Sequence, residues 1–154
     1  MAHYYLDSSA LVKRYVSERG TTWVEDLCEA RAGHMIYTVR VSGAEIIAAL
    51  FRRAHSGSLS LAAAQAEAAQ FKIDLANDYQ VVEVTESVVD IAMRLAEQHG
   101  LRGYDAVQLA AALSVHAARA TAGLPLLNFV SADTELNTAA AAEGLPVEDP
   151  NVHP

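Results

Sequence analysis

Four carboxylates stand at positions where a buried segment either ends or begins. Asp7 directly follows the apolar segment 4–6, and Asp133 follows the apolar segment 126–130 after two small residues. Both segments have the length and composition of buried strands, and parallel strands end at one common edge of their sheet. The two aspartates are therefore expected at that edge. The alternative is that each only caps the helix after it, since Asp is favoured at helix N-caps.

Glu45 and Asp105 lie in segments that are otherwise apolar. On a helix, the neighbours of Glu45 are apolar or small, namely Val41, Ala44, Ala48 and Ala49. Asp105 is the only formally charged residue in segment 103–118. An unpaired carboxylate at a buried position costs several kcal/mol, so each acid is expected to have a partner. The alternatives are an ion pair of Glu45 with Arg52 or Arg53, and a simple helix cap at Asp105.

Four acids at one edge of a sheet predict a divalent cation. Two carboxylates 4 Å apart repel each other by about 1 kcal/mol in water and by about 4 kcal/mol at an effective dielectric of 20. Oxygen ligands suit Mg²⁺ or Mn²⁺, whereas zinc would recruit histidines or Cys28, and the six histidines have no ligand spacing. We expect a Mg²⁺ site, with Mn²⁺ as an alternative, and raised pKa values of these acids when no metal is bound.

The elements that must position the acids alternate along the chain. Gly20 is expected to end the first helix, and no linker divides the chain, so residues 1–154 should form one domain. The alternation predicts an α/β fold with a central, mostly parallel sheet flanked by helices. Strands are expected at 4–6, 34–38, 80–84, 126–130 and 145–148, and helices at 10–18, 22–30, 41–55, 60–77, 86–99, 105–122 and 134–143.

Composition narrows the class of protein. The chain has 154 residues, of which 52% are hydrophobic and 19% are charged, as in a globular domain with a substantial core. Cys28 is the only cysteine, which excludes an intramolecular disulfide. We find no export signal and no segment long enough to span a membrane, so we expect a cytoplasmic protein. The net charge of −8 argues against nucleic-acid binding unless bound cations offset it.

The acids belong to four short motifs in a fixed order. These are Tyr-Leu-Asp-Ser-Ser-Ala-Leu-Val-Lys at 5–13, Ser-Gly-Ala-Glu-Ile at 42–46, Leu-Arg-Gly-Tyr-Asp-Ala-Val-Gln-Leu-Ala at 101–110, and Val-Ser-Ala-Asp-Thr-Glu-Leu at 130–136. Together they cover nearly the whole chain and resemble the PIN-domain family, specifically the VapC toxins of toxin–antitoxin pairs. The resemblance implies a PIN-like three-layer fold. It also implies that Asp7 and Asp105 are the principal metal ligands, that Glu45 and Asp133 complete the site, and that Ser131 and Ser8 support it.

The resemblance further implies an activity and partners. The activity is Mg²⁺-dependent endoribonuclease cleavage of RNA phosphodiester bonds, as the toxin of a type II toxin–antitoxin module. The expected partners are the RNA substrate, a cognate antitoxin protein and a second copy of the chain in a homodimer. We also expect the helix at 41–55 to add partner surface through Ile46, Ile47, Leu50 and Phe51.

Other functions remain open on the sequence alone. A PIN nuclease with a housekeeping role in RNA processing, or a non-catalytic PIN-like binding module, would carry the same motifs. A phosphoaspartate phosphatase is disfavoured because Ser9 stands where its second aspartate belongs, and a receiver domain lacks its extra acids and late lysine. Phosphate contacts are expected from some of the basic residues, although most should only be solvated: Lys13, Arg14, Arg40, Arg52, Arg53 and Arg102.

Overall fold

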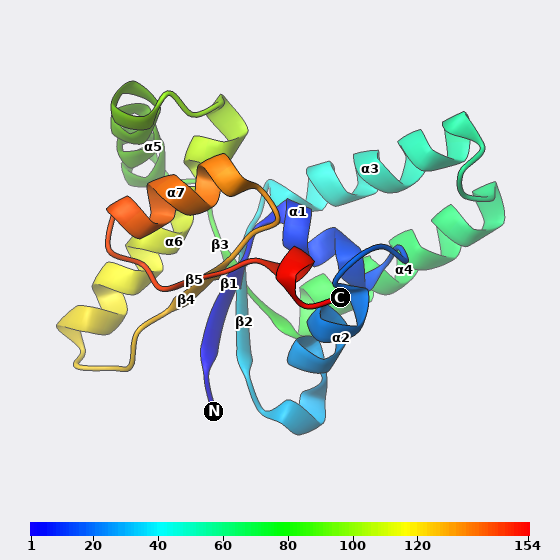
Figure 1. Cartoon of the computed structure of the whole chain (residues 1–154), viewed down its shortest axis with the longest axis horizontal. Coiled ribbons are helices and arrows are strands. Elements are labelled where there is room, and N and C mark those ends of the chain that lie inside the picture. The colour runs from blue at the N-terminus through cyan, green and yellow to red at the C-terminus, as the bar shows by residue number, and fades with distance from the viewer.

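The computed structural model describes the whole chain, residues 1–154, as a five-stranded sheet with helices on both faces (Figure 1). All strand pairs are parallel, and the strand order is β3-β2-β1-β4-β5. The strands are β1 (His3–Leu6), β2 (Met35–Val39), β3 (Tyr79–Val82), β4 (Asn128–Val130) and β5 (Val147–Glu148). The predicted α/β fold with a central parallel sheet is confirmed.

The helices form two layers because the strand side chains alternate between the faces of the sheet. Tyr5 and Phe129 belong to the core cluster with α5, α6 and α7, while Leu6 and Val130 belong to the cluster with α1 to α4. Figure 1 shows these two sets of helices on opposite faces of the sheet. The helices are α1 (Ser8–Leu11), α2 (Thr21–Cys28), α3 (Ser42–Ser56), α4 (Leu61–Asn77), α5 (Glu86–His99), α6 (Gly103–Thr121) and α7 (Thr134–Ala142). No helix combines the length and apolar character needed to cross a membrane.

The sheet order creates a crevice at the end of the central strand. The chain adds β2 and β3 on one side of β1, and later adds β4 and β5 on the other side. Parallel α/β sheets bind ligands where the direction of winding reverses in this way, beyond the carboxyl ends of the strands. The backbone N–H of Asp7 donates to the carbonyl of Val130 at 3.1 Å, which holds the ends of β1 and β4 side by side.

The first predicted helix is wrong in form. Instead of one helix over 10–18, the chain forms the short α1 and a 3₁₀ turn at Val12–Arg14. The reason is Lys13, which is buried and donates its Nζ protons to Glu18, to the Arg19 carbonyl and to Asn151. These bonds require the chain to turn back after the 3₁₀ turn, so a regular helix cannot continue through Glu18.

Gly20 does not end a helix, contrary to expectation. It stands at the N-cap of α2 with a φ of +86°, a conformation that favours glycine. A Cβ atom there would collide with the backbone of Pro150, in the 3₁₀ turn Pro150–Val152 near the C-terminus. The glycine therefore allows the C-terminal segment to close over the start of α2.

Candidate active site at the carboxyl edge of the sheet

Asp7 lies fully inside the protein at the end of β1, with its carboxylate held by three donors. Oδ1 accepts from the Ser9 hydroxyl at 2.7 Å and from the Ala10 N–H at 2.9 Å, and Oδ2 accepts from the Ser131 hydroxyl at 2.7 Å. The bond to Ala10 makes Asp7 the N-cap of α1. Asp7 is therefore both a helix N-cap and a buried carboxylate at the edge of the sheet, so these two interpretations of its sequence position do not exclude each other.

The pKa of Asp7 is raised from 3.8 to about 6. Burial is the main cause, since a buried carboxylate loses the solvation of its charge, and Asp105 adds a smaller repulsive contribution. The hydrogen bonds from Ser131, Ser9 and Ala10 oppose this rise by stabilising the charged form. The predicted rise in pKa is confirmed for this residue, with desolvation rather than repulsion as its larger cause.

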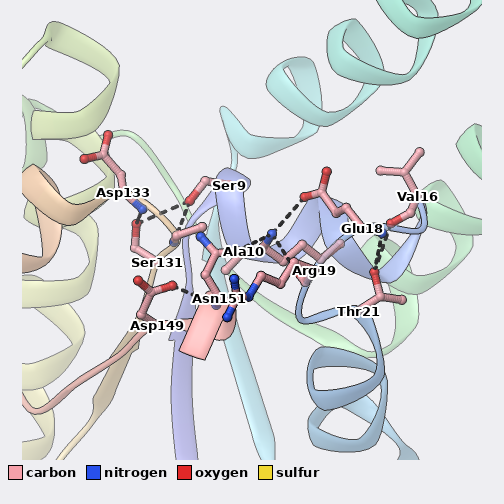
Figure 2. Close-up of polar contacts among 12 residues, drawn as sticks. Ser9, Ala10, Val16, Glu18, Arg19, Thr21, Ser131, Asp133, Asp149 and Asn151 are labelled. Atoms are coloured by element: carbon pink, nitrogen blue, oxygen red, sulfur yellow. Dashed lines mark hydrogen bonds and ion pairs between the residues drawn. The ribbon is translucent and has the colours of Figure 1, made fainter. Parts of the chain in front are cut away.

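Two serine hydroxyls connect Asp7 to the segment that follows β4. Ser131 donates to Asp7, and Ser9 accepts from the N–H of Ala132 at 3.0 Å. Ser131 also accepts from the N–H of Asp133 at 3.1 Å, and Figure 2 shows Ser9, Ser131 and Asp133 side by side. Asp133 itself caps α7, because its Oδ1 accepts from the N–H of Leu136. Ser131 therefore has a defined place in the site, as a hydrogen-bond bridge between the first and the last of the four acids.

Glu45 is held by side chains from two other elements. Its Oε2 accepts from the Ser8 hydroxyl at 2.8 Å, and its Oε1 accepts from the side-chain amide of Gln108 at 3.0 Å. It makes no ion pair with Arg52 or Arg53, which was the alternative expectation, and Arg53 instead pairs with Glu18. Glu45 is thus fixed in orientation without being neutralised.

Gln108 extends this arrangement into the core. The Tyr5 hydroxyl donates to Gln108 Oε1 at 2.8 Å, while Gln108 Nε2 donates to both Glu45 and the Ser42 hydroxyl. A carboxylate can only accept, so the Gln108 amide must turn its NH₂ group toward Glu45 and its oxygen toward Tyr5. Because Gln108 is only 1% exposed, this orientation is imposed by the protein and not by solvent.

Asp105 is the acid without a partner. It is the third residue of α6, whose N-cap is Arg102, and its carboxylate makes no hydrogen bond or ion pair with the protein, so the cap interpretation is wrong. Its pKa is raised by partial burial and by the negative charges of Asp133 and Glu45, while Arg102 opposes the rise. None of the ion pairs of the molecule includes Asp7, Glu45, Asp105 or Asp133.

Three of the acids line one pocket of about 600 Å³ beyond the carboxyl ends of the strands. They are Glu45, Asp105 and Asp133, and Ser8 and Ser9 line it with them. Asp7 does not line this pocket, but its carboxylate bonds to Ser9, which does. The structure therefore gathers all four predicted acids at one edge, as the sequence indicated.

The oxygen atoms that line the pocket suit a hard cation, but the carboxylates lie too far from one another to hold it. All four acids offer carboxylate oxygens, no histidine or cysteine lines the pocket, and Asp105 has no competing protein partner. As the side chains stand, no group of three His, Cys, Asp or Glu residues lies close enough to hold a metal ion. Binding would require the carboxylates to approach each other from their present hydrogen-bonded positions.

The basic residues that the sequence suggested as phosphate contacts divide into two groups. Four are occupied within the protein: Lys13 and Arg53 by Glu18, Arg14 by Asp74, and Arg40 by Glu83. The other two, Arg52 and Arg102, make no ion pair or side-chain hydrogen bond, and both line the acid pocket. Only these two arginines remain available to a ligand there.

The sequence interpretation missed the residues that hold the acids. Gln108 had a usable signal, since it is the one amide in a long apolar stretch and lies three residues after Asp105, on the same side of the helix. Ser9 and Tyr5 carried no such signal, because a serine beside a helix start and a tyrosine in a strand are common. The expected partner surface on α3 is corrected for two of its four residues, since Ile46 and Leu50 are fully buried in the core. Ile47 and Phe51 are only partly buried, and for them the partner surface stays a prediction.

The sequence of this chain is similar to those of known proteins over nearly its whole length. The model of the PIN domain matches residues 4–141. Two curated relatives from Mycobacterium tuberculosis are each 33% identical over 156 residues, with 97% of both chains covered: Ribonuclease VapC45 (strain CDC 1551 / Oshkosh) and Ribonuclease VapC49 (strain ATCC 25618 / H37Rv).

Solved structures share the fold at lower identity. PAE2754 from Pyrobaculum aerophilum aligns with a TM-score of 0.62 at 22% identity, covering 99% of this chain and 92% of that one. VapC20 of M. tuberculosis, described as a toxin that cleaves the sarcin–ricin loop, aligns with a TM-score of 0.61 at 20% identity, covering 92% and 95%. On the match over residues 4–141 and the identity to VapC45 and VapC49, the chain belongs to the PIN-domain family and, within it, to the VapC group.

Proposed function

We propose that this protein is a Mg²⁺-dependent endoribonuclease and the toxin of a type II toxin–antitoxin module. The observation that carries the proposal is the set of four carboxylates at the carboxyl edge, none of them ion-paired and one of them, Asp105, without any partner. Its second support is the name of the two curated relatives, which are ribonucleases at 33% identity over nearly their whole length.

Asp7, Glu45, Asp105 and Asp133 would hold the cation, with Mn²⁺ as an alternative to Mg²⁺. A bound divalent ion supplies three effects to phosphodiester hydrolysis: it acidifies a coordinated water, polarises the phosphoryl oxygen and stabilises charge on the leaving oxygen. Mg²⁺ and Mn²⁺ prefer oxygen ligands, and no histidine or cysteine lines the pocket.

The side chains of this protein contribute orientation and charge. Ser9 and Ser131 donate to the two oxygens of Asp7, and Ser8 and Gln108 donate to the two oxygens of Glu45, so both carboxylates are held at the carboxyl edge of the sheet. Asp105 has no hydrogen-bond partner in the protein, so its carboxylate oxygens are free to bind the cation. Arg52 and Arg102 supply positive charge for the phosphate.

The partners are part of the proposal. A toxin of this kind would be held inactive by a cognate antitoxin, and the chain would pair with a second copy. Two structures that share its fold contain complexes. One is VapBC2 from Rickettsia felis, bound to a DNA fragment from the promoter of VapBC2, and the other is a toxin–antitoxin complex from Klebsiella pneumoniae. At identities of 13% and 12%, these two structures show only that the fold is shared. We therefore propose an antitoxin because the chain belongs to the VapC group, and not because of these structures.

The test is RNA cleavage by the purified protein. We expect single-stranded RNA to be cut in Mg²⁺ or Mn²⁺, cleavage to stop with EDTA, and Mg²⁺ to restore it. Induced expression should arrest growth and leave new RNA 5′ ends, and co-expression of an adjacent antitoxin gene should relieve the arrest. Cleavage without growth arrest would indicate a housekeeping nuclease. Absence of cleavage in either metal would overturn the catalytic assignment in favour of a binding module.

A further inference from the structure

A second groove opens directly beside the acid pocket. It has a volume of about 860 Å³ and lies between α5 and the beginning of α6. Its lining is mainly apolar, from Val89, Ala92, Met93, Ala96, Tyr104 and Val107. The Tyr104 side chain is 63% exposed and Met93 is 54% exposed, so the groove presents an aromatic ring and a flexible thioether to solvent. An apolar patch of this kind on an otherwise charged surface indicates a binding function.

The groove and the acid pocket are continuous. Five residues line both of them: Glu45, Arg52, Arg102, Tyr104 and Asp105. A molecule in the groove therefore lies next to whatever is bound at the acids. For a nuclease, the neighbour of the scissile phosphate is the next nucleotide of the same strand.

The charges at this junction complement a nucleic-acid strand. The chain has 11 lysines and arginines, and most of them pair with acids or with backbone carbonyls of the protein. Arg52 and Arg102 are free, although the protein carries a net charge of −8 and has many acids to pair with them. Two unpaired guanidinium groups around an exposed tyrosine form a usual arrangement for a phosphodiester flanked by a stacked base.

We propose that this groove is the nucleobase subsite of the enzyme, in which a base adjacent to the scissile bond stacks on the ring of Tyr104. The subsite rests on the proposed ribonuclease function. Arg52 and Arg102 hold the phosphates on either side of that nucleotide, and the apolar wall of α5 covers the other side of the base. Stacking on an aromatic ring tolerates different bases, so the subsite selects for an unpaired nucleotide more than for one sequence.

The experiment combines a change in the protein with a change in the RNA. A pool of single-stranded RNA oligonucleotides, with Mg²⁺ present, first gives the cut site of the parent protein. Two oligonucleotides are then compared, one intact and one with an abasic residue next to the cut. We expect Tyr104→Ala to raise KM about tenfold on the intact RNA and to have no further effect on the abasic RNA. Tyr104→Phe keeps the ring and should cut like the parent.

A matched control is Leu126→Ala. Leu126 is 59% exposed, close to the value for Tyr104, but it precedes β4 and so lies at the opposite edge of the sheet from the acids. It should cut both RNAs like the parent, which excludes a general effect of removing an exposed apolar side chain. Because Tyr104 is mostly exposed, its replacement by Ala leaves the core intact.

The outcomes separate the subsite from the function on which it depends. If the parent cuts no RNA in the pool, the ribonuclease function is overturned. If the parent cuts but Tyr104→Ala leaves KM unchanged, or raises it equally on intact and abasic RNA, the nucleobase subsite is overturned. If Tyr104→Ala cuts normally but escapes inhibition by the cognate antitoxin, the groove is a protein-docking surface and the proposal is likewise overturned.

Discussion

Two groups of polar residues in this protein differ in whether their carboxylates are paired with a positive charge. The first surrounds Asp74 of α4, which is 3% exposed and accepts from Tyr15 at 2.7 Å and from Gln70 at 2.8 Å, with Arg14 at 3.4 Å. The second is the set of acids at the carboxyl edge of the sheet. Both contain carboxylates, but only Asp74 forms an ion pair with a cation of the protein.

The difference indicates which group is structural and which is functional. Asp74 has its charge balanced by Arg14 and its oxygens filled by donors, so the protein alone completes that group. At the carboxyl edge the hydrogen bonds to Asp7 and Glu45 are complete, yet no positive charge of the protein pairs with any of the four acids. The negative charge of these four acids would therefore be balanced by a cation that binds from outside the protein.

The largest effect is expected from removing the unpaired charge. Asp105→Asn preserves the size of the side chain and costs no hydrogen bond, so the fold should be unaffected. RNA cleavage in Mg²⁺ should fall by at least about 100-fold, and growth arrest on expression should be lost. Cleavage by Asp105→Asn within a fewfold of the parent would contradict the functional side of the comparison.

The matching change in the structural group is Asp74→Ala. It leaves Arg14 without its counter-ion and removes the carboxylate to which the Tyr15 hydroxyl donates. The free energy of unfolding should fall by about 3 kcal/mol, measured by urea titration. Below its melting temperature, the variant should cleave RNA at the rate of the parent. Loss of activity in the folded variant would show that the two groups are coupled.

A third experiment uses pH on the protein without metal. The pKa of Asp7 is about 6 in the folded protein and 3.8 when unperturbed, so its stabilising contribution is complete below pH 3.8 and is lost as pH rises through 6. This loss amounts to about 3 kcal/mol, and Asp7→Asn, which keeps the cap, should not suffer it. In EDTA, the free energy of unfolding of the variant should therefore increase relative to that of the parent as pH rises from 4 to 7.

Thermal or urea unfolding of parent and Asp7→Asn at several pH values measures this difference. Since both proteins contain the same other titrating groups, subtraction removes their contributions. A difference that does not change with pH would mean that Asp7 is solvated in the folded protein. Because a proton and a cation compete for the Asp7 carboxylate, the Mg²⁺ concentration for half-maximal cleavage by the parent should also rise as pH falls below about 6.

The smallest effect is expected from the residue that orients Glu45. In the double variant Tyr5→Phe with Gln108→Leu, both members of a buried hydrogen bond become apolar. Ser42 and Glu45 each lose one donor, but Thr38 still donates to Ser42 and Ser8 to Glu45, so stability should fall only slightly. Glu45 loses the donor to its Oε1, and the Mg²⁺ concentration for half-maximal cleavage should rise about tenfold. Tyr5→Phe alone is the control. An unchanged Mg²⁺ requirement in the double variant would make Gln108 a core residue only.

Much of the fold could be predicted from the sequence because its elements agree with their local signals. Ser60 and Thr85 cap α4 and α5, as their position before apolar periodic segments suggests, and Gly100 takes the left-handed conformation that ends α5. The first helix could not be predicted, because its interruption depends on Lys13 reaching Asn151, a contact across 138 residues. Local periodicity contains no information about such a contact.

The acids of the site could be found for the same reason that they stand out energetically. A carboxylate among alanines, such as Asp105, is conspicuous in the sequence because it is costly in the fold. The groups that hold the acids were harder to find, since Ser9 and Tyr5 contact the site only when β1, β4 and α6 meet. The groove beside Tyr104 had no sequence signal at all, because it depends on how α5 packs against α6.

The bond between Ser131 and Asp7 joins residues 124 positions apart. During synthesis at roughly 5–20 residues per second, an interval of roughly 6–25 seconds separates the addition of these two residues. Until the second has left the ribosome, the nascent chain has Asp7, Glu45 and Asp105 but lacks the strand and serine that complete the pocket. The pocket of the proposed nuclease therefore cannot be completed before Ser131 has left the ribosome, so its own messenger RNA and ribosome are not exposed to the complete site until then.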